Sequence, residues 1–285
     1  MNNSNYKFLL VQGRAISQTD NLLQSFPSNW KEEFPIINTL GFSGIEWIYD
    51  KHSELSNPIL TENGRKDILY LSKKNNVNLE NIVFDWFLSY SFLQKNELAQ
   101  KKNIEKFLNL MQNCADVGFK RIIFPLLDKN KINSDKEIIT LVAHFKKYII
   151  KQLDLLDIEI HFETSLSPDK EKLIMTLFNH KKIKICFDMG NSTSEGFDPI
   201  QVISILDDHL GSVHIKDRKF GGPSVPIGQG DVKFQHIFHS LNKINFNGPI
   251  SFQIYRNRCS DNILLLKSSL TFINEIISKS VNDSQ

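Results

Sequence analysis

The stretch IEIHFETSLSPDKEKLIMTLFNHKKIKICFDM, residues 158–189, has the pattern of a strand, a helix and a second strand. Its two ends, IEIHFET and IKICFDM, alternate β-branched or aromatic residues with other side chains, which predicts strands. Between them, Ser167 and Pro168 mark a helix start, and DKEKLIMTLF carries apolar residues at helical spacing. Strands that alternate with helices in this way predict a parallel sheet.

The same pattern runs along the whole chain. Strands are predicted at residues 7–12, 44–49, 80–87, 121–127, 158–164, 183–189, 212–217 and 249–255. Eight strand and helix units in 285 residues predict an α/β fold with a single (β/α)8 TIM barrel domain spanning residues 1–285. An open doubly wound sheet is the alternative, but VQGRAISQTD after the first strand lacks its G-x-G-x-x-G turn.

The composition and charge of the chain exclude some classes of binding partner. The chain has 41% hydrophobic residues and a formal charge of +2, with 34 Lys and Arg against 32 Asp and Glu. Because the lysines are scattered, we expect no nucleic acid partner. No apolar stretch is long enough for a bilayer and the N-terminus lacks a signal-peptide pattern, so we expect a cytoplasmic protein without a membrane partner. The sequence leaves open whether it forms a homo-oligomer.

Polar side chains gather on one side of the predicted strands. Alternate residues of a strand face opposite sides, so the outward β-branched and aromatic residues leave the others facing the barrel interior. Near the strand ends these inward residues are Glu46, Asp85, Glu163, Asp188, His214 and Gln253. The carboxyl ends of barrel strands are where active sites form in this fold, so we expect the site at that rim.

Four of these residues make a plausible metal site. Glu163, Asp188, His214 and Gln253 offer two carboxylates, an imidazole and an amide oxygen, a ligand set suited to a divalent ion. Two buried carboxylates without a cation would be costly. Glu46 and Asp85, taken singly, also fit helix caps or solvated rim residues, and His161 fits a hydrogen-bonded core histidine.

Five stretches of the sequence resemble a known family. GFSGIEWIYD, HFETSL, ICFDMGN, SVHIKDRKFGGPSVPIGQGDVKF and PISFQIYR resemble the sugar phosphate isomerase/epimerase family, the xylose isomerase-like barrels. The resemblance implies one divalent metal ion (Mn, Zn, Mg or Co) held at Glu163, Asp188, His214 and Gln253. It also shows two departures, because Gln253 stands where the family has a glutamate and Asn191 where many members have a histidine.

The resemblance implies an enzyme that moves a proton next to the carbonyl of a sugar or sugar phosphate. Glu163 is the expected base, with Glu46 and Asp85 in reserve. Epimerisation needs two acid/base groups, whereas aldose-ketose isomerisation can use one, and an amide cannot titrate near neutral pH. Gln253 therefore favours an isomerase, ahead of a ketose 3-epimerase. A carbohydrate-binding barrel without activity and an AP endonuclease-like phosphodiesterase are the remaining alternatives.

The substrate contacts are expected around the strand at 212–217. Lys216 and Arg218, followed by glycines at 221, 222, 228 and 230, favour a phosphate site, and Asn191 lies on the neighbouring loop. The competing interpretation is that these glycines only make turns. Trp47 and Trp86 could offer apolar faces to a sugar ring, although such aromatics more often pack under helices.

Overall fold

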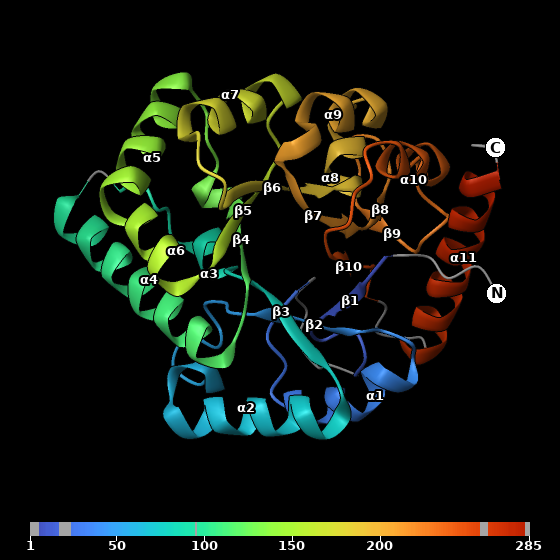
Figure 1. Cartoon of the computed structure of the whole chain (residues 1–285), viewed down its shortest axis with the longest axis horizontal. Helices are drawn as coiled ribbons and strands as arrows, with labels where there is room; N and C mark the ends of the chain where they lie inside the picture. Colours follow the sequence, from blue (N-terminus) through green and yellow to red (C-terminus); the bar gives the residue numbers. More distant parts are fainter. Residues whose placement is uncertain (1–5, 17–23, 95, 257–261, 283–285) are drawn as a thin grey trace.

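The computed structural model describes residues 6–16, 24–94, 96–256 and 262–282. Its parallel strands close into a barrel in the order β1-β10-β7-β6-β5-β4-β3-β2, with the helices around it (Figure 1). The barrel strands are β1 (Phe8–Val11), β2 (Gly44–Ile48), β3 (Asn78–Val83), β4 (Arg121–Leu126), β5 (Glu159–Thr164), β6 (Ile183–Asp188), β7 (Leu210–Ile215) and β10 (Ile250–Phe252). The predicted (β/α)8 TIM barrel is confirmed.

Helices connect successive strands, and their ends follow from local sequence. Asn96 accepts a hydrogen bond from the Ala99 N–H and begins a long helix, which ends at Gly118 with a φ of +93°. The α-helices are α1 (Glu33–Thr39), α2 (Glu62–Asn75), α3 (Trp86–Ser89), α4 (Glu97–Val117), α5 (Asp135–Tyr148), α6 (Ile150–Leu156), α7 (Pro168–Phe178), α8 (Met189–Ser194), α9 (Pro199–Leu206), α10 (Phe234–Lys243) and α11 (Asn262–Asn282). Short 3₁₀ turns are η1 (Trp30–Glu32), η2 (Pro58–Leu60), η3 (Asp128–Asn130) and η4 (Asp207–His209).

Two predicted strands extend well beyond the observed ones, the strand predicted at 212–217 lies two residues earlier as β7, and one hairpin was not predicted. The strand expected at 80–87 ends at Val83, because Asp85 adopts helical dihedral angles and α3 begins at Trp86. The strand expected at 249–255 is reduced to β10. Between β7 and α10 the chain forms a small antiparallel hairpin of β8 (Asp217–Arg218) and β9 (Ser224–Val225), so the eighth barrel strand carries the label β10.

The core has two parts, separated by the barrel wall. Inside the barrel, one apolar cluster consists of Val11, Ile48, Val83, Ile123 and Cys186. The larger cluster packs the outer faces of the strands against the helices. The predicted alternation is confirmed in β6, where Cys186 belongs to the inner cluster while Ile183 and Ile185 belong to the outer one.

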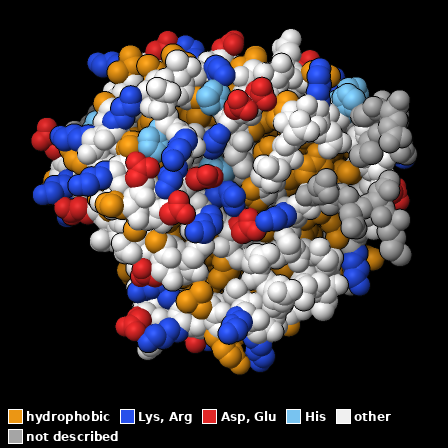
Figure 2. Space-filling view, viewed as in Figure 1, with side chains coloured by type: hydrophobic (Ala, Val, Ile, Leu, Met, Phe, Trp, Pro, Cys, Tyr) orange, Lys and Arg blue, Asp and Glu red, His pale blue; other side chains and the backbone are white. Residues whose placement is uncertain are grey.

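The surface carries charges of both signs. On the face in Figure 2, Lys and Arg side chains lie interspersed with Asp and Glu side chains. No helix in the described segments has the length and apolar character needed to span a bilayer.

Candidate active site

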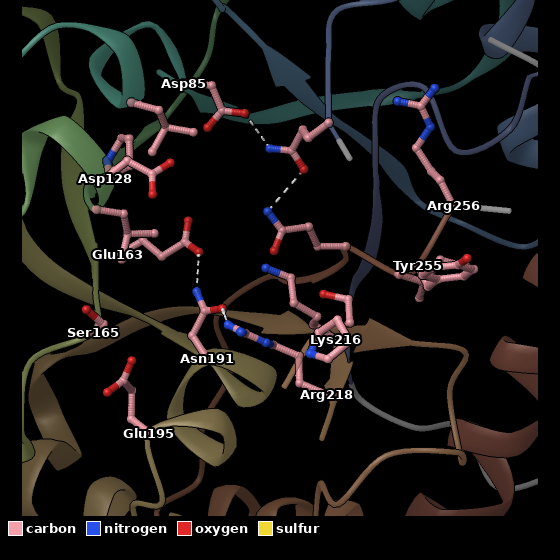
Figure 3. Close-up of a pocket in the computed structure, with 18 of the residues that line it drawn as sticks. Asp85, Asp128, Glu163, Ser165, Asn191, Glu195, Lys216, Arg218, Tyr255 and Arg256 are labelled. Carbon is pink, nitrogen blue, oxygen red and sulfur yellow. Dashed lines mark hydrogen bonds between the residues drawn. The ribbon is translucent and has the colours of Figure 1, made fainter. Parts of the chain in front are cut away.

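A cavity of about 570 Å³ opens at the carboxyl ends of the barrel strands. Figure 3 shows the side chains of Asp85, Glu163, Asn191, Lys216 and Arg218 around it. Gln253 also lines the cavity, together with residues of the loops after the strands, among them Arg14, Gln24, Asp128, Ser165, Glu195, Tyr255 and Arg256. The expected rim location therefore holds a cavity large enough for a small molecule.

Three of the four predicted metal ligands meet beside this cavity. Glu163, Asp188 and His214 are buried, and each offers one ligand atom within 4.8 Å of the others. The Nδ1 atom of His214 lies 3.7 Å from Glu163 Oε2 and 3.9 Å from Asp188 Oδ2. The register between β6 and β7 produces part of this arrangement, because it pairs Asp188 with His214.

The atoms left without partners fit a metal ion. Among the described residues, neither His214 Nδ1 nor the buried Gln253 Oε1 has a hydrogen-bond partner. A buried polar atom without a partner costs free energy, and a cation bound at His214 Nδ1 in place of a proton would satisfy that atom. A nitrogen and three oxygens from these side chains make a ligand set for a divalent ion. The residues present therefore fit the metal that the family implies.

Glu46 lies behind the site rather than in the cavity. Its Oε1 is 2.8 Å from His214 Nε2, and its Oε2 accepts hydrogen bonds from Ser251 Oγ at 2.6 Å and Asn81 Nδ2 at 3.0 Å. Because the Glu46 side chain is fully buried and does not line the cavity, it is poorly placed as the reserve base suggested by the sequence. A carboxylate in this position would orient the imidazole of His214 toward a metal ion.

The surroundings of His214 favour its protonated form. Burial disfavours the imidazolium, but interactions with Cys186, Glu46 and Glu163 outweigh burial and raise the pKa of His214 well above its ordinary value. Burial alone would also raise the pKa of Asp188, but Lys216 and His214 lower it. The Lys216 Nζ atom lies 2.8 Å from Asp188 Oδ2. The site thus favours ionised carboxylates with cations next to them.

Asn191 and Arg218 hold Glu163 rather than pointing freely into the cavity. Asn191 Nδ2 donates to Glu163 Oε1 at 3.1 Å, and Arg218 Nη1 donates to Asn191 Oδ1 at 3.0 Å. The other Arg218 nitrogens donate to the Gly222 carbonyl, at 3.1 Å from Nε and 2.7 Å from Nη2. Both side chains line the cavity, and both are already committed to these partners.

Asp85 lines the cavity, as do the acidic residues Asp128, Glu163 and Glu195. Gln24 Nε2 donates to its Oδ2 at 2.6 Å. Burial, reinforced by the negative charge of Glu163, raises the pKa of Asp85 to about 7 despite this hydrogen bond. A group with such a pKa can exchange protons near neutral pH.

Backbone N–H groups of the glycine-rich loop donate hydrogen bonds to a side chain of the same loop. Asp217 accepts hydrogen bonds from the backbone N–H groups of Gly228 at 2.8 Å, Gly230 at 2.9 Å and Val232 at 3.3 Å. A Cβ at Gly230 would lie 1.9 Å from Asp217 Oδ1, so a glycine is required there. These N–H groups point at Asp217, which agrees with the structural interpretation of the loop.

The two tryptophans lie outside the cavity. Trp47 is fully buried on the outer face of β2, where it packs against Trp30 and donates to Asn57 Oδ1 at 3.1 Å. Trp86 stacks on Tyr90 with ring centroids 4.3 Å apart, and its Nε1 donates to Glu54 Oε2 at 2.6 Å. Neither ring is placed to contact a sugar in the cavity, because each packs against neighbouring side chains.

Sequence patterns missed other lining residues. Gln24 and Tyr255 lie outside the helices and strands, and Arg14 follows the first strand in a short turn. Of these three residues, only Arg14 could have been identified from the sequence as a candidate site residue, because it is a cation just after a predicted strand. Gln24 belongs to a segment without periodicity, and nothing in the sequence near it indicates contact with the site.

Comparisons with known proteins agree with this geometry. Residues 34–276 match the model of a family described as the xylose isomerase-like TIM barrel. The chain belongs to this family. The putative L-ribulose-5-phosphate 3-epimerase SgbU of Haemophilus influenzae is 20% identical over 256 residues, which cover 85% of this chain and 90% of that protein. The L-ribulose-5-phosphate 3-epimerase UlaE of Escherichia coli O1:K1 is 20% identical over 239 residues, covering 81% and 84%.

Solved structures share the fold. An L-ribulose 3-epimerase superposes with a TM-score of 0.77 at 16% identity, covering 98% of this chain and 97% of the other. The IOLI protein with a binding zinc atom has a TM-score of 0.76 at 16% identity, covering 96% and 99%. The predicted membership among sugar isomerase and epimerase enzymes is confirmed by the family match and the relatives.

Proposed function

We propose that this protein is a metal-dependent enzyme that moves a proton at a carbon next to the carbonyl of a small sugar or sugar phosphate. Epimerisation at C3 of a ketose is the reaction that the cavity supports best. The observation that carries this proposal is that Asp85, one of four acidic residues lining the cavity, shares that cavity with Glu163, which belongs to the Glu163, Asp188 and His214 group. The relatives named as 3-epimerases agree with it.

The metal would be one divalent ion, Mn, Zn, Mg or Co, held by Glu163, Asp188, His214 and the amide oxygen of Gln253. Two carboxylates and two neutral ligands balance the charge of such an ion. When bound, it stabilises the negative charge that develops on an enediolate.

Glu163 is the group that takes the proton from the substrate carbon. Its carboxylate is held by Asn191, which is held in turn by Arg218, so its orientation is fixed before the substrate binds. The Lys216 ammonium beside Asp188 places a positive charge where a sugar oxygen becomes negative. Lys216 and Arg218 also line the side of the cavity where a phosphate group would be attracted.

Asp85 is the group that returns a proton to the other face of the carbon. With a pKa raised to about 7, it is present in both protonation states near neutral pH. Gln253 cannot do this, because an amide does not titrate there. Aldose-ketose isomerisation remains the second candidate, because it needs only one acid/base group and the amide of Gln253 cannot act as a second one.

Deuterium incorporation separates the two reactions. Ketoses and ketose phosphates are incubated in D₂O with metal-loaded wild type, Asp85→Asn or Glu163→Gln, quenched with a chelator and measured by NMR. We expect wild type to form the C3 epimer with deuterium at C3, Asp85→Asn to lose epimer at least about a hundredfold, and Glu163→Gln to lose exchange.

Other outcomes would contradict the proposal. Deuterium in an aldose product that is unaffected by Asp85→Asn would support the isomerase instead. A lack of exchange with every sugar tested, in protein that binds metal, would favour a barrel that only binds carbohydrate.

A further inference from the structure

The amide of Gln253 can serve a metal only if its oxygen faces the site, because its NH₂ group has no lone pair to offer. We infer that Gln24 is the positioning residue that turns the Gln253 carbonyl oxygen toward Glu163, Asp188 and His214. This inference rests on the metal site of the proposed function and adds a residue that carries no ligand atom.

The first step fixes the oxygen of Gln24. Arg14 Nη2 donates to Gln24 Oε1 at 2.9 Å. The Arg14 guanidinium has only donors, and it is anchored by hydrogen bonds to the backbone carbonyls of Gln12 at 3.2 Å and Ile254 at 3.3 Å. Because Arg14 is nearly fully buried, its guanidinium is held in place. The Gln24 atom facing Arg14 must therefore be the oxygen.

The second step fixes the nitrogen of Gln24. Gln24 Nε2 donates to Asp85 Oδ2 at 2.6 Å. Because Arg14 already faces the oxygen of this amide, the NH₂ group is the end that remains for Asp85, and a carboxylate oxygen of Asp85 accepts its hydrogen bond. A donor-only group on one side and an acceptor on the other leave one favourable orientation for this amide.

The third step transfers this orientation to Gln253. Gln253 Nε2 donates to Gln24 Oε1 at 3.1 Å. The hydrogen bond that Asp85 accepts from Gln24 is drawn as a dashed line in Figure 3. If the Gln253 amide were turned over, its oxygen would face the oxygen of Gln24, and its NH₂ group would take the position that Oε1 has now. The observed orientation instead leaves Gln253 Oε1 without a hydrogen-bond partner among the described residues.

Asn191 is a second amide on the cavity wall that an arginine orients, but here the amide nitrogen, and not the oxygen, contacts the neighbouring site residue. Arg218 donates to the oxygen of Asn191, so the Asn191 nitrogen donates to Glu163. The Glu163 carboxylate needs a hydrogen-bond donor, and the NH₂ group of Asn191 supplies it. The Gln253 NH₂ group needs an acceptor, and the oxygen of Gln24 supplies it. Gln24 is therefore suited to an amide at position 253 and unsuited to a carboxylate there.

Metal titration tests this role. Chelator-treated full-length protein is titrated with Zn²⁺ against a chromophoric chelator, comparing wild type, Gln24→Met, Gln253→Met and the double variant. Methionine keeps the approximate length of the side chain and removes the amide. We expect Gln24→Met to weaken Zn²⁺ binding about tenfold or more, and to have no further effect in the Gln253→Met background.

Controls separate positioning from folding. Gln229→Met, on the exposed part of the hairpin loop, should bind Zn²⁺ like wild type. Circular dichroism and thermal melts of the metal-free variants should match those of wild type. Equal losses from Gln24→Met in both backgrounds, or no loss in wild type, would overturn the inference.

A metal-free measurement distinguishes failure of this inference from failure of the proposed function. In ¹⁵N-glutamine-labelled protein, the side-chain NH₂ signals of Gln253 are identified by their absence in Gln253→Met. We expect them to shift in Gln24→Met because their acceptor is lost, and unshifted signals would overturn the inference. Wild type that binds no Zn²⁺ while the signals do shift would refute the proposed metal site and leave the Gln24 contact established.

Discussion

His214 and His161 are both buried histidines of the barrel strands, but their hydrogen bonds differ. His161 Nδ1 lies 2.9 Å from Ser212 Oγ and its Nε2 lies 3.0 Å from Glu159 Oε2, so both ring nitrogens are satisfied. His214 has Glu46 at Nε2 and no hydrogen-bond partner at Nδ1 among the described residues. The prediction that His161 is a hydrogen-bonded core residue is confirmed by these contacts.

These two pairs provide a matched test. Glu46→Gln removes the negative charge behind His214, which should weaken divalent metal binding about ten- to a hundredfold. Glu159→Gln makes the same chemical change beside His161 and should leave metal affinity unchanged. Zn²⁺ titration of both variants measures the effect. Wild-type affinity in Glu46→Gln would mean that this carboxylate does not support the imidazole.

Strand alternation predicted which side chains face the barrel interior, but not how far each lies below the cavity. It placed Glu46, Glu163, Asp188 and His214 on the inner side of the barrel, and the structure places them there. It could not show that Glu46 lies one layer below the cavity, because alternation carries no information about the register between strands. The suggestion that Trp47 contacts a sugar conflicted with its outward position in that same alternation.

At the scale of elements, the segment after β3 was the least predictable. The run from Ile82 to Phe87 is apolar except for Asp85, and a short apolar run of this kind cannot be assigned to strand or helix from periodicity. In the structure the Trp86 N–H donates to the Tyr49 carbonyl at 3.0 Å, and the chain turns into α3. This turn leaves Asp85 lining the cavity at the end of its strand.

The β8–β9 hairpin provides a prediction at this scale. Asp217→Asn replaces one carboxylate oxygen with an NH₂ group, which cannot accept from the loop N–H groups. Since a hydrogen bond to a charged group contributes about 1.5–3 kcal/mol, opening of the hairpin should increase about tenfold or more. Limited trypsin cleavage after Arg218 and Lys219 should accelerate, and KM should rise because Arg218 is displaced.

Asp231→Asn is the control for this variant. Asp231 is on the same loop but half exposed, and its Oδ2 accepts one backbone hydrogen bond, from Phe220 at 2.8 Å. Its effect on cleavage and on KM should be small. Similar acceleration in both variants would show that any loss of charge loosens the loop, and that Asp217 has no particular role in holding it.

At the scale of the whole molecule, the barrel was predictable because its signal is repeated along the chain. An error at one strand end, as in β3, does not change the number or order of the units. The burial of one polar residue on a helix leaves no repeated pattern in the sequence, so it could not be predicted in the same way. Glu171 reads as an ordinary polar residue of a helix, yet α7 places it in the interior, with Thr164 Oγ1 donating to its Oε1 at 2.7 Å.

This buried glutamate predicts how stability depends on pH. Burial raises the pKa of Glu171 to about 8, outweighing the Thr164 hydrogen bond, from an ordinary value of 4.5. Below pH 4.5 the group is protonated in both the folded and the unfolded states. As pH rises toward 8, the unfolded state releases this proton before the folded state does, so the free energy of unfolding falls.

Glu171→Gln should remove this contribution while keeping an acceptor for Thr164. We therefore expect its urea midpoint, relative to that of wild type, to rise steadily between pH 5 and pH 8 in metal-free protein, where ligand binding adds nothing to stability. Glu105→Gln, on the exposed side of α4, removes a carboxylate without a buried proton and should keep a constant offset from wild type. A constant offset for Glu171→Gln as well would mean that Glu171 is ionised inside the fold across this range, and its partner would then have to be sought among the side chains around Thr164 and Asp188.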